Sequence, residues 1–386
     1  MTIRLTNLAL IILLLLPVSL SAQVVINEFS CANRNINTDN YGENEDWIEL
    51  YNTSGSAVDL SGYYLSDKAG NPTKWQIPTG VTIAANGYRL VWASNRNENS
   101  GGNLHTNFKL TQTINNEYVV FASPTGVIID SVHITPTRAN MSRGRQTDGS
   151  ATWGVFTDPS PNAANGPATE FYNGFAPTPN IEPSSGGYAT TVSVTITCTD
   201  PTASIYYTTN GNTPTNASTL YTGAFDVTNT QVVKAIVIST DATLLRSFME
   251  TNTYLINVSH TIPVISISGD QVDNLINGNL NIQPAGAFEL FNANLELQDE
   301  AIGEFNKHGN DSWGYPQRGI DYITRDEFGY DNDIDDEIFS TSNRDEFQRL
   351  ILKAAASDNY PFEGGGAHIR DAFVQQLSQV GNLNLD

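Results

Sequence analysis

The chain has 386 residues, and its 41 acidic and 19 basic side chains give a formal net charge of −22. A surface this acidic repels polyanions, whereas nucleic-acid-binding proteins carry basic patches, so we expect no DNA or RNA partner. The chain has two cysteines, Cys31 and Cys198, and both lie in stretches of alternating apolar residues. A disulfide is chemically possible outside the cell, but small buried hydrophobic side chains are the favoured interpretation.

The first 22 residues have the features of a secretory signal peptide. Arg4 is followed by the apolar run Leu8–Leu16, and small residues lead to Ala22, where we expect cleavage. The alternative is a membrane anchor, but a spanning helix needs roughly 20 apolar residues, and this run is shorter. We therefore expect a secreted or cell-surface protein whose mature chain has no transmembrane anchor. Its 364 residues (386 − 22) are enough for two or three domains.

Residues 24–165 have the pattern of an all-β domain. Short apolar runs alternate with turn residues such as glycine and asparagine, and helical periodicity is nearly absent. In residues 45–65, EDWIELYNTSGSAVDLSGYYL, a short apolar strand leads through the polar turn Asn52–Ser56 into further apolar residues. This order predicts strand, turn and strand of an antiparallel sandwich.

The same region resembles the lamin-tail domain family. Besides residues 45–65, the resemblance rests on five stretches: INEFSCAN (26–33), LSDKAGNPTKWQIP (65–78), NGYRLVWAS (86–94), LHTNFKLT (104–111) and GVIIDSV (126–132). It implies an immunoglobulin-like β-sandwich with no catalytic residues. Trp47, Trp75 and Trp92 invite comparison with a carbohydrate-binding platform, but in a sandwich such aromatic residues more often belong to the core.

A second β module is expected over residues 181–256, after a Pro-, Asn- and Gly-rich linker at 166–180. Val192–Cys198 alternates between apolar and polar residues, and Asn210–Gly211 is a strong hairpin signal. Val232–Ile238 also alternates, which places Lys234 on the outward face.

This second module resembles the C-terminal domain of chitobiases and β-hexosaminidases. The resemblance rests on the order YYT, NG, TPT and LYTG between residues 206 and 223, followed by Thr253-Tyr254. In that family the domain is an accessory sandwich and not the glycosidase. The resemblance therefore implies no sugar hydrolysis.

From residue 260 to 386 the composition changes to a mixture of strand-like and helix-like segments. Apolar residues recur at helical spacing in Asp345–Ala355 and in Ala367–Gly381, so helices are predicted there. We expect this third module to be α+β.

The third module resembles the N-terminal part of the CotH-type spore-coat kinase-like family. The residues that carry the resemblance include IPVIS (262–266), HGNDS (308–312), PQR (316–318), 325–329 and IRDA (369–372). It implies an exported atypical protein kinase that uses ATP with Mg or Mn. In that family the metal- and adenine-binding residues follow the region matched here, so we expect ATP and metal only for the full-length domain. This chain alone is expected to bind no cofactor and to be inactive, and its catalytic residues are unknown.

The segment 308–312 is the candidate phosphate site. Its backbone N–H groups, with Asn310 and Ser312, have the composition of a phosphate cradle, and Arg318 is a candidate phosphate contact. The resemblance has Lys near this position, and Arg and Lys are not interchangeable. The alternative is an ordinary Gly-Asn turn with Arg318 in a surface ion pair.

No metal site is predicted. The acidic run at 331–337 lacks the glycine and the closing glutamate of an EF-hand loop, so a solvated acidic loop is favoured over a calcium site. The five histidines are scattered and form no HExxH motif.

Taken together, the sequence predicts a mainly β protein. Two tandem immunoglobulin-like β-sandwiches are followed by an incomplete α+β kinase-like domain. The first functional hypothesis is a secreted multidomain bacterial surface protein whose parent is an exported CotH-type kinase, with the sandwiches as targeting modules. The alternative is a non-catalytic adhesion or cell-envelope-binding protein. The expected partner is a protein or a cell-envelope glycan on the cell exterior.

Overall fold

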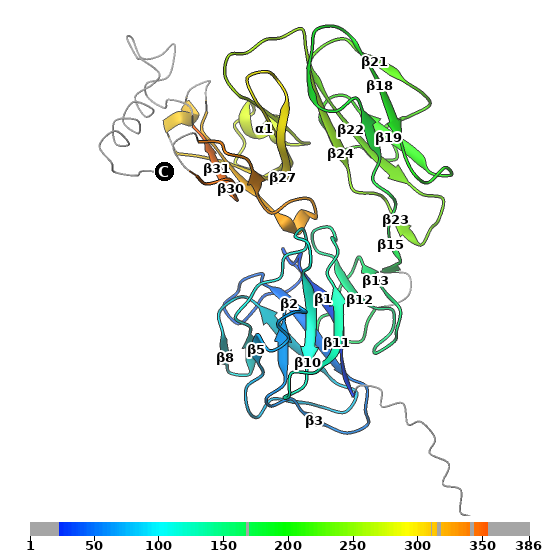
Figure 1. Cartoon of the computed structure of the whole chain (residues 1–386), viewed down its shortest axis with the longest axis vertical. Helices are drawn as coiled ribbons and strands as arrows, with labels where there is room; N and C mark the ends of the chain where they lie inside the picture. Colours follow the sequence, from blue (N-terminus) through cyan, green and yellow to red (C-terminus); the bar gives the residue numbers. More distant parts are fainter. Residues whose placement is uncertain (1–22, 167–169, 310, 315–317, 340–342, 354–386) are drawn as a thin grey trace, which may run out of the picture.

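The computed structural model describes residues 23–353 except 167–169, 310, 315–317 and 340–342. The predicted signal peptide and the predicted helix at 367–381 lie outside the described residues. The described chain is mainly β, as predicted, and forms three modules. Figure 1 shows the first module, from blue to cyan, below the second (green) and the third (yellow to orange).

The first module comprises β1–β14 and is built from two principal sheets. The larger sheet has the order β14-β13-β12-β1-β2-β7-β9-β8, and the smaller has the order β11-β10-β4-β5. The strands are β1 Val24–Ser30, β2 Asp46–Asn52, β3 Val58–Asp59, β4 Tyr64–Ser66, β5 Trp75–Gln76, β6 Thr82–Ile83, β7 Tyr88–Ala93, β8 Glu98–Ser100, β9 Asn103–His105, β10 Tyr118–Ala122, β11 Ile128–His133, β12 Ser142–Arg145, β13 Trp153–Phe156 and β14 Phe171–Tyr172.

The core of this module lies between the two sheets. Ile48, Leu50 and Val91 project from the larger sheet and pack with Leu65 and Phe121 of the smaller one. This is the immunoglobulin-like sandwich that the sequence predicted. The three tryptophans at positions 47, 75 and 92 are at most 5% exposed, so they are buried rather than displayed as a platform. Cys31 is also buried in this core, with its thiol free.

The second module comprises β15–β24. A sheet of order β16-β18-β21 faces a sheet of order β17-β24-β22-β19-β20, and Val194, Ile196, Val233 and Tyr254 form the core between them. The strands are β15 Gly174–Phe175, β16 Asn180–Glu182, β17 Gly186–Tyr188, β18 Val192–Thr197, β19 Ser204–Thr208, β20 Thr219–Leu220, β21 Phe225–Val227, β22 Gln231–Ile238, β23 Leu244–Leu245 and β24 Glu250–Ile256.

The third module is an antiparallel five-stranded sheet of order β25-β26-β27-β28-β31, with a small β29-β30 pair. Phe288, Phe305, Tyr322 and Leu350 pack against the short helix α1 (Val272–Ile276) on one face. The strands are β25 Val264–Ser268, β26 Ala285–Phe291, β27 Leu297–Lys307, β28 Ile320–Thr324, β29 Ile334–Asp335, β30 Glu346–Phe347 and β31 Arg349–Leu352, and two 3₁₀ turns cover Asp311–Gly314 (η2) and Asp326–Phe328 (η3).

The helix predicted over Asp345–Ala355 is wrong for the described part of that segment. Residues 349–352 form β31, which pairs with β28, so that Leu350 is buried and Ile351 is 51% exposed. The apolar spacing of the segment also fits a short strand at a sheet edge, and backbone pairing with β28 decides between the two. The predicted hairpin is present, because β19 and β20 pair antiparallel, but Asn210–Gly211 lies in a loop that is longer than a two-residue turn.

The predicted linker connects the first two modules, but its described residues are paired on both sides. β14 hydrogen-bonds with β13 of the first module, and β15 runs parallel to β23 of the second. Composition predicted a free tether because proline and asparagine are common there, whereas these short strands depend on partners far away in sequence.

Arg138 joins the first module to the second. Its guanidinium lies 4.9 Å from the ring centroid of Phe175 and 5.7 Å from that of Phe248, and it donates hydrogen bonds to the backbone carbonyls of Arg246 and Ser247. Burial lowers the pKa of Arg138 to about 10. An arginine between two aromatic faces with two carbonyl acceptors is a strong inter-module contact.

The third module meets the other two at Gly329. Its φ of +83° favours glycine, and a Cβ there would lie 2.5 Å from the carbonyl oxygen of Thr137 and 2.7 Å from the Phe248 ring. The next residue, Tyr330, accepts a 2.7 Å hydrogen bond at its hydroxyl from the backbone N–H of Met249. Residues of all three modules therefore converge at one point, which we call the three-module junction (Thr137, Arg138, Phe248, Gly329 and Tyr330).

Arg138→Ala is expected to loosen the first module from the other two, at a cost of about 2–4 kcal/mol of inter-module free energy. Gly329→Ala is expected to act in the same direction, because the junction has no room for a methyl group. Small-angle X-ray scattering should report a larger radius of gyration for both variants. The control is Lys109→Ala, which removes an exposed ion pair with Glu45 inside the first module. An unchanged radius of gyration in both junction variants would show that other contacts fix the modules.

Candidate functional site

Of the three predicted phosphate contacts, only the side chain of Arg318 lies within the described residues. Asn310 is outside them, and Ser312 lies in η2 with its side chain outside them. Arg318 donates from Nη1 to the carbonyl of Ile276, and its guanidinium lies 5.5 Å from the Trp313 ring centroid. The structure thus places Arg318 against its own module, and the predicted cradle remains a prediction.

A second cation accompanies Arg318 at the Trp313 ring. Lys307 Nζ lies 4.6 Å from the ring centroid and donates to Asn279 Oδ1 at 2.8 Å. Nearby, Asp321 accepts from Arg349 Nη2 at 2.6 Å and lies 2.9 Å from His308 Nδ1. An otherwise acidic chain therefore gathers cationic side chains around one buried tryptophan. This arrangement can attract an anionic group.

Two buried glutamates lie side by side on the outer face of the first module's larger sheet. Glu28 of β1 and Glu49 of β2 are cross-strand partners, and both are fully buried. Each comes from a motif that carries the lamin-tail resemblance, INEF and WIEL. Because like charges directly opposite each other repel, such a pair needs hydrogen-bond donors or protons.

The donors come from the segment that follows β13. Glu28 accepts from Ser160 Oγ at 3.0 Å and from Ser142 Oγ, and Glu49 accepts from the Asn162 N–H at 2.6 Å and from Asn27 Nδ2 at 3.0 Å. Burial, as the largest effect, raises the pKa of Glu49 to about 8. The two glutamates therefore hold residues 160–162 against the sheet, and their role is structural.

A polar pocket of about 340 Å³ lies in the first module where this held segment meets β7 and the β8–β9 turn. Asn37, Trp92, Asn103 and Asn162 contribute to its lining. The Oδ1 atom of Asn37 is buried without a hydrogen-bond partner. Amide groups beside an indole ring form a suitable environment for hydroxyl groups of a ligand.

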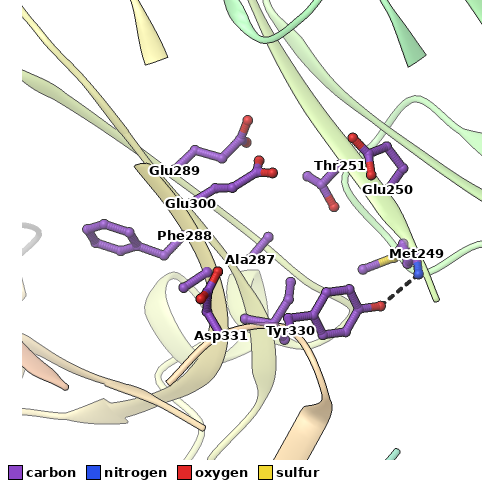
Figure 2. A pocket seen from close by; sticks show the side chains of 11 residues that line it. Met249, Glu250, Thr251, Ala287, Phe288, Glu289, Glu300, Tyr330 and Asp331 are labelled. Carbon is purple, nitrogen blue, oxygen red and sulfur yellow. Dashed lines mark hydrogen bonds between the residues drawn. The ribbon is translucent and has the colours of Figure 1, made fainter. Parts of the chain in front are cut away.

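An acidic recess of about 120 Å³ lies between β24 of the second module and β26 and β27 of the third. Figure 2 shows the side chains of Glu289 and Glu300 extending toward Glu250 and Thr251 on the opposite wall. Tyr330 of the three-module junction forms part of the lining. Among the described residues, its hydroxyl group donates no hydrogen bond to the other lining side chains. We refer to this site as the inter-module recess.

Desolvation dominates the electrostatics of the recess. It raises the pKa of Glu300 to about 8 and that of Asp331 to about 6, and it also raises the pKa values of Glu250 and Glu289. The only cation of the described residues that acts on Glu289 is Lys234, whose own pKa burial lowers to about 8. Lys234 was predicted to face outward from the second module, and it does, but the third module buries it completely.

The sequence prediction missed the glutamates of both sites. Glu28 and Glu49 lie in quoted motifs, and a glutamate at a position predicted to be inside a sandwich strand was the available signal. For Glu289 and Glu300 there was no comparable signal, because the recess that they border is formed together with a second module. Alternation along one strand does not predict contacts between modules.

Comparison with protein families now gives independent results. The Lamin Tail Domain family matches residues 17–136, and the chitobiase/beta-hexosaminidase C-terminal domain family matches residues 183–246. No curated protein matches the chain. The first two predicted resemblances are thereby confirmed, while the CotH-type resemblance of the third module stays a prediction. The described residues contain no helix that is long and apolar enough to cross a membrane.

Glu49→Gln is expected to flatten the pH dependence of stability. In the folded protein the pKa of Glu49 is about 8, against an ordinary 4.5, so the folded state retains a proton that the unfolded state releases between these values. The stability from this group is therefore present below pH 4.5 and is lost as the pH rises toward 8, at up to about 1.4 kcal/mol per pH unit.

Thermal midpoints measured between pH 4.5 and 8 check this expectation. The wild type should lose stability across the window, and Glu49→Gln should lose clearly less. Glu337→Gln, at an exposed position, is the control and should follow the wild type. Parallel curves for the wild type and Glu49→Gln would contradict the assigned protonation of Glu49.

Proposed function

We propose that this chain is the binding part of a secreted or cell-surface multimodular protein, and that its first module binds a hydroxyl-rich ligand such as a cell-envelope glycan. The single observation that carries the proposal is the polar pocket of about 340 Å³ beside Trp92. Its volume lies in the range of ordinary ligand sites. The family matches support the choice of class, because the lamin-tail resemblance implies a sandwich without catalytic residues and the chitobiase resemblance implies an accessory sandwich.

The chemistry of the pocket supports a neutral polar ligand. Asparagine side chains each supply two donors and an acceptor, which suits neighbouring sugar hydroxyls. The unpartnered Oδ1 of Asn37 is an acceptor whose desolvation is not offset by any bond within the described residues. A ligand hydroxyl would offset it. Arg89 also lines the pocket and opposes a cationic ligand, while the net charge of −22 opposes an anionic one, so a neutral glycan is favoured.

Asn37→Ala is expected to weaken glycan binding about three- to tenfold, the effect of one lost hydrogen bond, without lowering the thermal midpoint. Stability should be preserved because the deleted acceptor has no partner in the protein. Screening the mature chain on an array of neutral and amino-sugar oligosaccharides, followed by titration calorimetry, measures this. Asn99→Ala, on the neighbouring β8 and outside the pocket, is the matched control. Absence of glycan binding, or equal affinities for the wild type and Asn37→Ala, would refute the proposal.

A second candidate function is that of the parent predicted from the sequence, an exported atypical protein kinase of the CotH type. The specific observation that favours it is the cation cluster around Trp313, where Lys307 and Arg318 lie within 4.6 and 5.5 Å of the ring centroid. Cationic side chains are one component of a site for a transferring phosphoryl group. Carboxylates that hold Mg²⁺ or Mn²⁺ are another, and the proposal assigns them to the full-length domain.

The chain by itself is expected to transfer no phosphate. Phosphoryl transfer requires a metal ion to neutralise the developing charge, and no ready-made group of three metal-ligating side chains occurs in the described residues. Incubation of the mature chain with labelled ATP and Mg²⁺ or Mn²⁺ should leave label at background. Metal-dependent incorporation that Lys307→Ala abolishes would instead establish a kinase in this chain.

A further inference from the structure

The two glutamates of the third module in the inter-module recess are an unusual pair. Glu289 of β26 and Glu300 of β27 are direct cross-strand partners, so both side chains leave the same face of the sheet. Cβ atoms in such pairs lie about 4.5–5.5 Å apart, and like charges in this position are destabilising. The second module buries Glu289, whereas Glu300 stays exposed at the mouth of the recess.

The two carboxylates differ in their partners. Glu289 accepts from Ser185 Oγ at 2.6 Å, from the Thr253 N–H at 3.1 Å and from Thr253 Oγ1. Among the described residues, neither Glu300 nor Glu250 on the opposite wall has a side-chain hydrogen bond or ion pair. The carboxylates of Glu250 and Glu300 therefore border the recess without hydrogen-bond partners in the described part of the chain, whereas the carboxylate of Glu289 is hydrogen-bonded.

Thr251 supplies an independent indication that a ligand is missing. The residue is only 7% exposed, and its Oγ1 atom is buried without a hydrogen-bond partner. Figure 2 shows this hydroxyl directed into the recess between Glu300 and Tyr330. A buried hydroxyl without a hydrogen-bond partner costs free energy. A bound ligand that contacts the hydroxyl oxygen would offset this cost.

We propose that the inter-module recess binds a divalent cation, with calcium preferred, and that the ion ties the second module to the third. Free oxygen atoms of Glu250, Glu300 and Thr251 would be ligands, and Glu289 would contribute negative charge. The side chains are not preassembled as a complete ligand set. Calcium suits the recess because it accepts six to eight oxygen ligands in flexible geometry, including water, whereas magnesium requires near-ideal octahedral geometry.

The surrounding charges favour a bound cation, rather than protonation of the carboxylates alone, as the means of neutralising the recess. Four acidic groups face the recess, namely Glu250, Glu289, Glu300 and Asp331, and Asp299 lies close enough to act on Glu300 and Asp331. Lys234 is the one basic group among the described residues that acts on these carboxylates. It attracts Glu289 electrostatically, and its ammonium group donates a 3.2 Å hydrogen bond to the Ser268 carbonyl. Protonation can relieve the repulsion, but no carboxyl group is placed to hydrogen-bond with the Thr251 hydroxyl, so that oxygen still has no partner within the described residues.

The test compares thermal midpoints of the chelator-treated mature chain with and without 1 mM calcium chloride at pH 7.5. We expect a dissociation constant of about 0.1–1 mM, as in extracellular calcium modules, and a rise of roughly 2–4 °C. Magnesium should give a smaller rise. Titration calorimetry with calcium alone gives the affinity directly.

Two variants distinguish an effect on calcium binding from an effect on the stability of the calcium-free protein. Glu300→Gln keeps the shape but removes one charge, so the midpoint without calcium should rise, and calcium affinity should fall at least tenfold. Thr251→Val removes the unpartnered hydroxyl and should weaken calcium binding about threefold or more without destabilising the calcium-free protein. Asp226→Asn, an exposed acid on β21 of the second module's other sheet, should behave as the wild type.

Each remaining outcome counts against the proposal. A wild type whose midpoint does not respond to calcium, together with a stabilised Glu300→Gln, would show that the pair shares protons and binds no ion. A calcium response of equal size in the wild type, Glu300→Gln and Thr251→Val would place the bound ion elsewhere on this acidic surface. Glycan binding by the first module is measured separately, so either proposal can fail alone.

Discussion

The arrangement of the described chain depends on the insertion of Gly329 between Thr137 and Phe248. Only a residue without a side chain fits there, and only this fit lets Tyr330 reach the backbone of Met249 while Arg138 lies between Phe175 and Phe248. Each of these contacts joins two different modules. At the inter-module recess β24 lies beside β26 and β27, and the Gly186–Glu296 bridge and the Thr253–Glu289 hydrogen bonds hold the same two modules together.

The burial of a residue could be predicted from the sequence where its neighbours belong to its own module, but not where they belong to another module. Ile48 and Leu50 were predicted in a strand of the first sandwich, and both lie in its core, because residues two positions apart share one face of a sheet. Lys234 was correctly predicted to leave its own core, yet it is fully buried, since the covering surface comes from residues far ahead in the chain. Alternation distinguishes two faces but does not specify what covers the second.

The errors at Asp345–Ala355 and in the linker have the same origin. Leu350 and Ile351 satisfy a helical spacing, but a free edge of β28 is available for pairing, and a short strand there buries Leu350. In the linker, Phe171 and Phe175 find partners in β13 and β23, respectively, on opposite sides. Short elements of two to four residues depend on pairing partners rather than on local propensity. Of the candidate site residues, only Glu28 and Glu49 lay within motifs quoted from the sequence, so only their site had a signal from which it could be predicted.

The chain places glutamates opposite each other in two places, and the comparison between them indicates what each needs. At Glu28 and Glu49 the segment 160–162, with Ser142 and Asn27, brings donors to both carboxylates, so the polypeptide completes the site. At Glu289 and Glu300 the donors reach only Glu289. The repulsion between two carboxylates on one sheet face is therefore offset by the polypeptide itself in the first module, where both glutamates are buried, whereas in the third module Glu289 is buried and Glu300 is exposed. Between the second and third modules the polypeptide leaves Glu300 and the hydroxyl oxygen of Thr251 for an external group, which makes an ion the natural third component of that interface.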